Sequence, residues 1–191
     1  ILNAMGVIQM QQEKFSKSLE FFLKALNIAK DPTIEKTIWY LSTVQNPGSA
    51  RMLLLSTSYD LIGLLNAYTG NWIVNTKNQL KNYWEAEKYA NAAGDAGQIA
   101  YINFHMGIAY MNEGKLDSAR MFIKKAISTF SDLKDQTGLG RAMKYLGDTY
   151  ERMGDFDLAA NTILEAIALL KETNDHLHLG LGYISLSRVC T

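Results

Sequence analysis

The stretch MGIAY at residues 106–110 returns as LGDTY at residues 146–150, so a glycine and a tyrosine recur 40 positions along the chain (147 − 107). The stretch GKLDSA at 114–119 returns as GDFDLA at 154–159 with the same offset. Aspartates keep this spacing at positions 95, 135 and 175. Several matches at one offset predict a stack of similar units, because each unit then repeats the same local structure.

Each unit is predicted to contain two helices. Apolar residues recur three or four positions apart in 101–111 and 143–153, which is the period of an amphipathic helix. Gly114 and Gly154 then end the helix, since glycine adopts the left-handed backbone of a helix end. A second amphipathic stretch follows in each unit. We expect the glycines of the first helices to let the two helices approach closely, facing small residues on the second helix: Ala119, Ala126, Ala159 and Ala166.

This arrangement resembles the tetratricopeptide repeat, whose pattern runs large apolar, apolar-small and aromatic, then alanine, large apolar and alanine. One unit supplies the whole pattern: Met143, Leu146, Gly147, Tyr150, Ala159, Ile163 and Ala166. The N-terminal residues fit it as well, with Gly6, Ser18, Phe22 and Ala25. The usual period is about 34 residues, and the longer period here is similar to that of the extended repeats in bacterial regulatory proteins. The resemblance implies an all-α protein, a right-handed superhelical array of antiparallel helix pairs.

We expect a single solenoid over residues 1–191. Its units are predicted at about 1–30, 49–93, 97–133 and 137–173, with the start of a fifth at 176–191, either a final capping helix or part of a longer array. Residues 31–48 depart from the repeat. Asp31-Pro32 suits a helix start and Asn46-Pro47-Gly48 a stop, which predicts an added helix over about 33–44 and a long helix over 49–69. The following helix, 72–93, lacks the expected alanine spacing.

Composition excludes several classes of protein. Hydrophobic residues make up 48% of the chain and charged residues 20%, which is too apolar for a disordered chain. The formal net charge of zero argues against a nucleic-acid-binding segment or one that binds an anionic membrane. The most apolar stretch, 52–67, is interrupted by polar residues such as Asp60, which argues against a membrane span. The single cysteine, Cys190, cannot form a disulfide within the chain.

The sequence offers no convergent catalytic or metal-binding set, so we expect no enzyme activity, cofactor or metal. His176 and His178 lie two apart, and side chains at this spacing on a helix point in different directions. Gly138-x-Gly140 precedes a helix, but no strand comes before it and the third glycine of a dinucleotide-binding loop is missing. These residues are interpreted as turns between repeats.

The resemblance places a binding groove on the concave face, which the first helix of each unit lines. We expect a protein or peptide ligand there. A clamp for a C-terminal carboxylate is disfavoured, because Asp148 would repel the ligand. The predicted groove residues are Tyr101, Phe104, His105, Ile108, Met111, Asn112, Arg141, Lys144, Tyr145, Asp148, Glu151 and Arg152.

The leading hypothesis for function is a non-catalytic interaction scaffold, the sensing or regulatory module of a larger bacterial signalling or transcription-control protein. The alternatives are a regulator of the peptide-pheromone receptor type and, least favoured, a helical accessory domain of an enzyme. We also expect a homodimer through the apolar C-terminal helix. The cytoplasm is the favoured compartment, and the periplasm stays open if the chain is the sensor part of a membrane-anchored protein.

Overall fold

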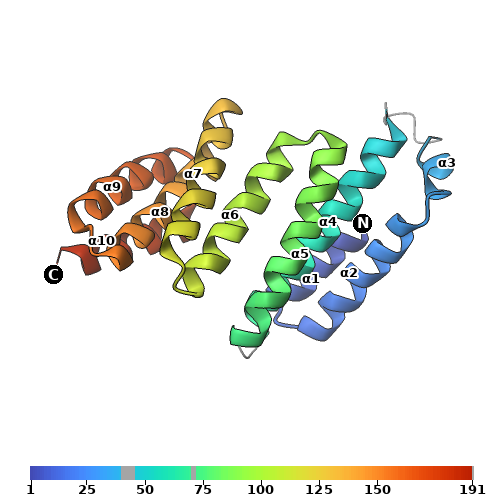
Figure 1. Cartoon of the computed structure of the whole chain (residues 1–191), viewed down its shortest axis with the longest axis horizontal. Coiled ribbons are helices and arrows are strands. Elements are labelled where there is room, and N and C mark those ends of the chain that lie inside the picture. Colours follow the sequence, from blue (N-terminus) through green and yellow to red (C-terminus); the bar gives the residue numbers. More distant parts are fainter. Residues whose placement is uncertain (40–45, 70–71, 191) are drawn as a thin grey trace. The chain divides into compact units, whose positions relative to one another are not determined.

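The structure is a computed structural model that describes residues 1–39, 46–69 and 72–190. All regular elements in these ranges are α-helices (Figure 1). They are α1 (Leu2–Gln11), α2 (Phe15–Lys30), α3 (Ile34–Trp39), α4 (Pro47–Tyr68), α5 (Trp72–Ala93), α6 (Ala96–Asn112), α7 (Leu116–Asp132), α8 (Gln136–Met153), α9 (Phe156–Glu172) and α10 (His176–Val189). The predicted all-α fold is confirmed. No helix in the described ranges is both long enough and apolar enough to cross a membrane.

The chain divides into two compact units, Ile1–Ile102 and Asn103–Thr191, with the division inside α6. In the first unit α1 packs on α2 and α4 on α5, and in the second α8 packs on α9. The helices therefore associate as adjacent pairs, as the repeat predicts. That all the units form one solenoid stays a prediction.

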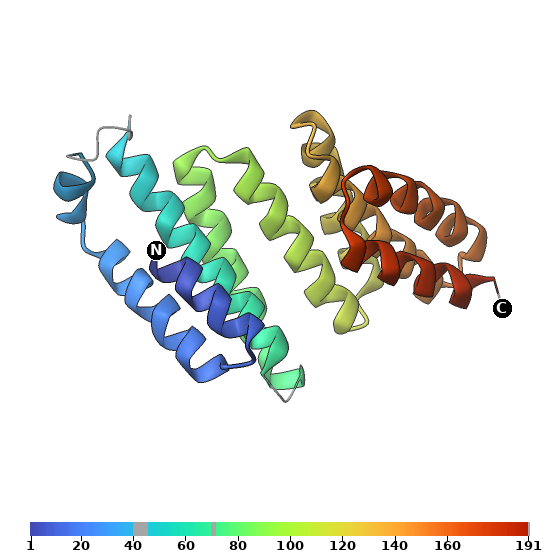
Figure 2. The same ribbon diagram turned by 180° about the vertical axis from the view of Figure 1, so that it is seen from behind.

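The first unit is built around an apolar core between its helices. Buried side chains from α2 and α4 form its centre: Phe22, Leu26, Ala29, Leu55, Ile62 and Leu65. The short helix α1 lies beside both α2 and α4 (Figure 2). The small α3 packs against α4 and is tied to it by an ion pair between Glu35 and Arg51.

The inserted segment differs from the sequence prediction at one point. The long helix predicted over 49–69 is present as α4, but Pro47 and Gly48 belong to its first turn, so it begins two residues earlier than predicted. The Asn46 side-chain oxygen accepts a hydrogen bond from the Ser49 amide at 3.1 Å, and proline suits the first helical position because it has no amide hydrogen to satisfy. The predicted helix over 33–44 is present as α3, and residues 40–45 lie outside the described residues.

A glycine in the first helix of each pair touches the second helix closely. A Cβ atom at Gly107 or Gly147 would stand 2.4 Å from the side chain 16 positions further on, which is an isoleucine in both pairs. In the α4–α5 pair the corresponding contact joins Gly63 to Tyr83, 20 positions on. The second helix of this pair, α5, is also longer than α7, with 22 residues against 17. One extra helical turn in α5 therefore explains why the α4–α5 repeat departs from the 40-residue spacing.

One alanine of the repeat pattern has a counterpart in α5, one turn later than an alignment from the start of the helix places it. Ala86 and Ala90 are fully buried in α5, 40 positions before Ala126 and Phe130 of α7, which are also fully buried. The repeat offset thus holds for the second half of α5. The expectation that this helix departs from the alanine pattern holds at the first alanine position, where the buried Gln79 stands 40 positions before Ala119.

The recurring aspartates are helix caps. Asp95, Asp135 and Asp175 each accept a hydrogen bond from the backbone amide three residues on, at distances between 2.7 and 3.2 Å. An aspartate there satisfies an amide that has no partner within the helix and places negative charge at the positive helix end. These caps set the start of α6, α8 and α10, and so fix which side chains lie on their exposed faces.

Candidate binding surface on the first helices of the second unit

Eleven of the twelve predicted groove residues lie in the second unit, on α6 and α8, whereas Tyr101 lies in the first unit. The second-unit residues separate by burial. Phe104, Met111, Lys144 and Asp148 are buried, with between 4% and 6% of their surface exposed. The others are half-buried or exposed, and we call five of them the α6–α8 surface: His105, Ile108, Asn112, Tyr145 and Arg152.

Aromatic side chains join α6 to α8. The ring of Phe104 meets the ring of Tyr145 edge-on, with centroids 5.3 Å apart and planes at 72°. This is a favoured geometry for an aromatic pair. The Lys144 ammonium lies 4.0 Å from the centroid of the Tyr145 ring, within reach of a cation–π interaction. Because Phe104 is buried in this cluster, the half-buried Tyr145 offers the aromatic surface that a partner can reach.

The charged row on α8 is paired within the protein. Lys144 Nζ lies 2.8 Å from Asp148 Oδ2, and Arg188 of α10 approaches Asp148 Oδ1 at 3.3 Å. Arg188 also donates two hydrogen bonds to the Glu151 carboxylate, at 2.9 Å and 2.7 Å. The predicted groove residues thus include two carboxylates that already have cationic partners. Asp148 faces two cations, so its charge is balanced rather than open to a ligand.

Arg188 is the member of this network that the sequence prediction did not include. A signal was available, because Arg188 lies 40 positions after Asp148 and so occupies the same place in its own helix. Residues in equivalent places on successive first helices face the same side of the unit. The repeat offset therefore indicated that α8 and α10 meet near Asp148 and Arg188.

The same pairing shifts the titration of the acidic groups. Hydrogen bonds from Arg188 lower the pKa of Glu151, and the bond with Glu151 raises the pKa of Arg188. Burial alone would raise the pKa of Asp175, but hydrogen bonds from Arg141 and His178 outweigh it and hold the pKa at about 2. Both carboxylates are therefore ionised at neutral pH. Groups held in this state stabilise structure and are poorly suited to donating protons.

Arg141 and Arg152 have contrasting roles. Arg141 Nε donates to Asp175 Oδ2 at 2.6 Å, which ties α8 to the start of α10. Arg152 donates to the Met111 carbonyl oxygen at 3.0 Å, near the C-terminal end of α6, where a cation is favourable. Arg152 is exposed, and among the described residues no carboxylate lies within ion-pairing distance of it. Its charge is available to a partner.

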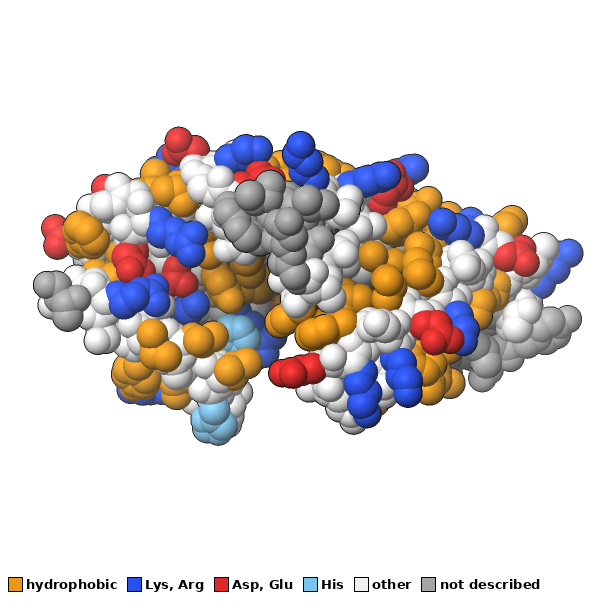
Figure 3. Space-filling model, turned by 90° about the horizontal axis from the view of Figure 1, so that it is seen from below, with side chains coloured by type: hydrophobic (Ala, Val, Ile, Leu, Met, Phe, Trp, Pro, Cys, Tyr) orange, Lys and Arg blue, Asp and Glu red, His pale blue; other side chains and the backbone are white. Residues whose placement is uncertain are grey.

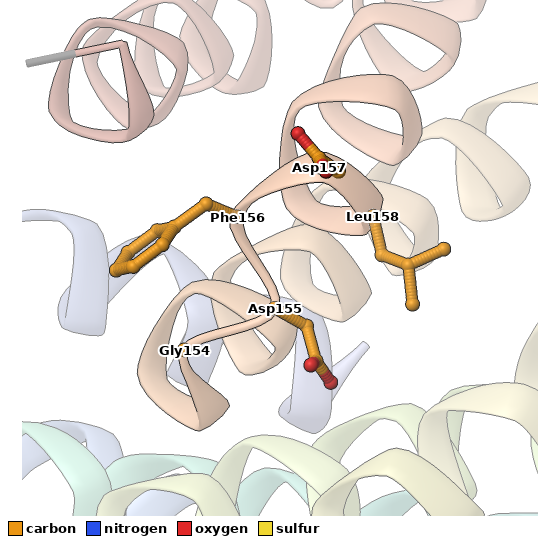
Figure 4. A pocket seen from close by; sticks show the side chains of 5 residues that line it. All are labelled: Gly154, Asp155, Phe156, Asp157 and Leu158. Carbon is orange, nitrogen blue, oxygen red and sulfur yellow. The ribbon is translucent and has the colours of Figure 1, made fainter.

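A second candidate place, at the turn between α8 and α9, lacks converging groups. It is an open hollow of about 450 Å³ lined by residues 154–158. Figure 4 shows the side chains of Phe156 and Leu158 pointing in opposite directions, and those of Asp155 and Asp157 also diverging. Within the described part of the chain, no group of three or more His, Cys, Asp and Glu residues is placed to hold a metal ion.

Apolar and charged side chains are mixed on the face of the molecule that is seen from below (Figure 3). Figure 3 shows lysine, arginine and carboxylate side chains scattered among hydrophobic ones on the face that it presents. This agrees with the formal net charge of zero. Recognition by a large field of one sign is therefore not a property of this face, and a partner would be selected by local contacts.

Comparison with known proteins gives matches to one family. Two family models match, both described as tetratricopeptide repeat, over residues 98–172 and 1–32. No match was found among the curated proteins.

Solved structures with a similar fold include BtubC (BKLC) from P. vanneervenii, at 18% identity and a TM-score of 0.74, covering 98% of this chain and 70% of that one. A STAND (Signal Transduction ATPase with Numerous Domains) protein with a tetratricopeptide repeat sensor, from Pyrococcus horikoshii, matches at 14% identity and a TM-score of 0.64, covering 98% of this chain and 32% of that one. Rap protein complexed with Competence and Sporulation Factor matches at 16% identity and a TM-score of 0.62, covering 98% of this chain and 61% of that one. At these identities the similarity concerns the fold.

Proposed function

The chain belongs to the tetratricopeptide repeat family, and we propose that it binds a protein or peptide segment on the α6–α8 surface as the sensing module of a larger bacterial signalling protein. Stacked helical repeats of this kind are interaction scaffolds. Two proteins of similar fold support a sensing role by analogy: one is described as carrying a tetratricopeptide repeat sensor, and the other is complexed with a signalling factor. The proposed role is non-catalytic.

One observation carries this proposal. On α8 the charges of Lys144 and Asp148 are buried in ion pairs, whereas Tyr145 and Arg152 stay accessible on the same helix. Ile108 and Asn112 are accessible on the neighbouring α6. The accessible set therefore combines apolar and aromatic contact area with one cation that is not ion-paired. Tyrosine and arginine are also the side chains that most often dominate binding energy at interfaces.

The spacing of these residues defines the kind of partner. Tyr145 and Arg152 lie seven residues apart on α8, which is about 10 Å along a helix. A partner segment of a few residues can reach both. It would place an apolar side chain against Ile108 and Tyr145 and a carboxylate against Arg152.

The test is selection from a displayed library of random short peptides, followed by fluorescence anisotropy with the selected peptides. We expect them to carry an apolar residue and an acidic residue. The double variant Ile108→Ser/Arg152→Glu should weaken binding by about tenfold or more, since it removes apolar area and places like charges together.

The matched control carries the same kinds of change on second helices, Lys125→Glu on α7 and Leu164→Ser on α9, where both side chains are exposed. It should keep the affinity of the unchanged protein, and both variants should keep its thermal unfolding midpoint. Equal affinities for the two double variants would place the binding site elsewhere. Enrichment of short hydrophobic peptides without acidic residues would contradict the role given to Arg152.

A further inference from the structure

The exposed face of α5 carries a row of basic side chains around a tryptophan. Lys77, Lys81, Trp84 and Lys88 are all exposed, and we call these four residues the α5 row. Their spacing of four, three and four residues places them within about 60° of the helix circumference. The row is about 16 Å long, because a helix rises about 1.5 Å per residue. The helix thus presents three cations and an indole along one line.

The same face is exposed on the second helices of the two following pairs. The offset of 40 positions aligns Ala86 of α5 with Ala126 of α7 and, after a further 40, with Ala166 of α9. In this alignment the places of the α5 row are filled by eight residues, all exposed: Asp117, Met121, Lys124 and Ser128 on α7, and Asp157, Asn161, Leu164 and Ala168 on α9. The fold therefore keeps this face open but does not require it to be basic.

The chain itself balances the charges of the α5 row only weakly. Within the described ranges, no carboxylate lies within ion-pairing distance of Lys77 or Lys81. Lys88 Nζ lies 3.8 Å from Glu85 Oε2, which is a long ion pair between two exposed side chains. The other carboxylate of α5, Glu87, lies about a quarter turn away from the row. An approaching anion therefore meets two lysines that are not ion-paired.

Trp84 adds apolar contact area between these cations. Its exposed fraction is 48%. A single exposed apolar side chain is common and indicates no function by itself. Tryptophan is, however, enriched among the residues that dominate binding energy at interfaces. A partner that uses the whole row needs acidic groups on both sides of an apolar one.

An acidic protein helix fits the α5 row better than a nucleic acid or an anionic membrane does. Those two ligands are bound by broad surfaces of one sign, whereas the formal net charge of this chain is zero and Glu85 and Glu87 flank the row. A helix can repeat the spacing of the row, since side chains at i, i+4, i+7 and i+11 share one face. The order of four, three and four is the same in both directions, so a partner helix can lie parallel or antiparallel to α5.

We propose that the α5 row binds an acidic amphipathic helix of a partner protein. Carboxylates of this helix pair with the three lysines, and an apolar side chain packs on Trp84. The row belongs to the first unit and shares no residue with the α6–α8 surface of the second. The proposal therefore does not depend on the function proposed above.

The test uses labelled, alanine-rich helical peptides and the full chain in fluorescence anisotropy. One peptide carries glutamate at i, i+4 and i+11 with leucine at i+7, which matches the row in parallel. A second carries glutamate at i, i+7 and i+11 with leucine at i+4, which matches it antiparallel. A third has the same composition with its glutamates spread around the helix. We expect one of the first two to bind at least about tenfold more tightly than the third, with an affinity that falls as salt is added.

Charge reversal in the row tests the place of binding. The variant Lys77→Glu/Lys81→Glu should bind the preferred peptide about tenfold or more weakly, because it replaces two attractions with two repulsions. The matched control Lys17→Glu/Lys125→Glu makes the same change in net charge at exposed lysines of α2 and α7. It should lose less than about threefold in affinity. Both variants should keep the circular dichroism spectrum of the unchanged protein. Equal losses of affinity would show that binding follows net charge alone, and would overturn the proposal.

Tryptophan emission tests the role of the indole. On addition of the preferred peptide, the emission of the unchanged chain should shift to shorter wavelength as Trp84 leaves water. The shift should be absent in Trp84→Ala, which keeps Trp39 and Trp72 and should bind about fivefold or more weakly. A shift that persists in this variant would show that the peptide does not cover Trp84, and would overturn the proposed site.

The remaining outcomes concern the class of partner. Equal binding of all three peptides, or failure of both matched peptides to bind, would overturn the proposal. Single-stranded oligonucleotides and phosphatidylserine vesicles are the competing ligands. Tighter binding of either one, lost in Lys77→Glu/Lys81→Glu, would assign the row to a polyanion and overturn the proposed acidic helix.

Discussion

Gly147 of α8 lies against Ile163 of α9 so closely that a Cβ atom on the glycine would stand 2.4 Å from Ile163 Cγ1 and 3.3 Å from the Ala159 carbonyl oxygen. The two helix backbones come close together at this point, because the glycine has no side chain to hold them apart. The same contact joins Gly107 to Ile123 in the preceding pair. Gly107 and Gly147, which mark the repeat in the sequence, are therefore points of close approach between paired helices.

Replacing Gly147 with alanine should destabilise the protein by about 1–2 kcal/mol. The added methyl group overpacks the contact with Ile163, which costs more than the gain in helix propensity returns. The matched variant Gly180→Ala adds the same methyl group into open space and should stabilise the protein by about 0.5–1 kcal/mol. Urea unfolding followed by circular dichroism measures both. A midpoint for Gly147→Ala at or above that of the unchanged protein would contradict the close approach.

The 40-residue offset predicted the helices of the second unit closely because their limits are set by local signals. The pattern ended two helices at Gly114 and Gly154, and in the structure α6 ends at Asn112 and α8 at Met153. Capping aspartates and a left-handed Gly154, with φ of 85°, act within a few residues of the helix ends. Signals of this kind can be recognised in the sequence alone.

The first unit was harder to predict because its signals are ambiguous or depend on packing. Asn46-Pro47-Gly48 fits both a helix stop and a capped helix start, and only the hydrogen bond from the Ser49 amide to Asn46 separates the two. The extra turn of α5 is defined by the contact of Gly63 with Tyr83. Nothing in the local sequence shows which residue of the second helix meets that glycine.

The candidate site could be predicted in position but not in accessibility. The helix register gave the face on which Lys144 and Asp148 lie, but charged residues there were expected to be open to a ligand. Their burial depends on each other and on Arg188, a contact across 40 residues of sequence. A residue's type does not reveal such a partner. This is why the surface proposed for binding is smaller than the predicted groove.

Replacing Ser18 with alanine should stabilise the protein by about 1 kcal/mol. The Ser18 side chain is fully buried, and its hydroxyl oxygen has no hydrogen-bond partner among the described residues. A buried polar group without a partner is costly, and the equivalent positions in the second unit are Ala119 and Ala159. The control is Ser56→Ala, which loses a 2.8 Å hydrogen bond to the Ala86 carbonyl oxygen and should cost about 1 kcal/mol. Urea midpoints that move in the same direction for both variants would contradict this assignment.

The pair of Arg188 and Glu151 should couple by about 1 kcal/mol in a double-mutant cycle. Arg188 binds both carboxylate oxygens, and a two-point contact holds its geometry better than a single one. The cycle uses Arg188→Met and Glu151→Gln with urea unfolding. As a control, Arg120 and Asp117 on α7 form a single contact at 2.9 Å in which the carboxylate side chain is far more exposed, 85% against 19% for Glu151, and this pair should couple by less than about 0.5 kcal/mol. Equal coupling energies for the two pairs would show that the two-point contact between α8 and α10 stabilises the protein no more than a single surface ion pair.

Replacing Asp175 with asparagine should destabilise the second unit by about 1–2 kcal/mol at neutral pH. Asparagine still caps α10, so the loss comes from the ion pair with Arg141 and the contact with His178. The pKa of Asp175 is about 2 in the folded chain, below its ordinary value of 3.8. The stabilisation is therefore complete above about pH 5 and is lost progressively as the pH falls towards 2, because the unfolded chain takes up the proton first. Urea midpoints at pH 7, 4 and 2.5 should differ between the two proteins at pH 7 and converge at the lowest pH. A difference that stays constant over this range would mean that the carboxylate charge is not what holds the start of α10.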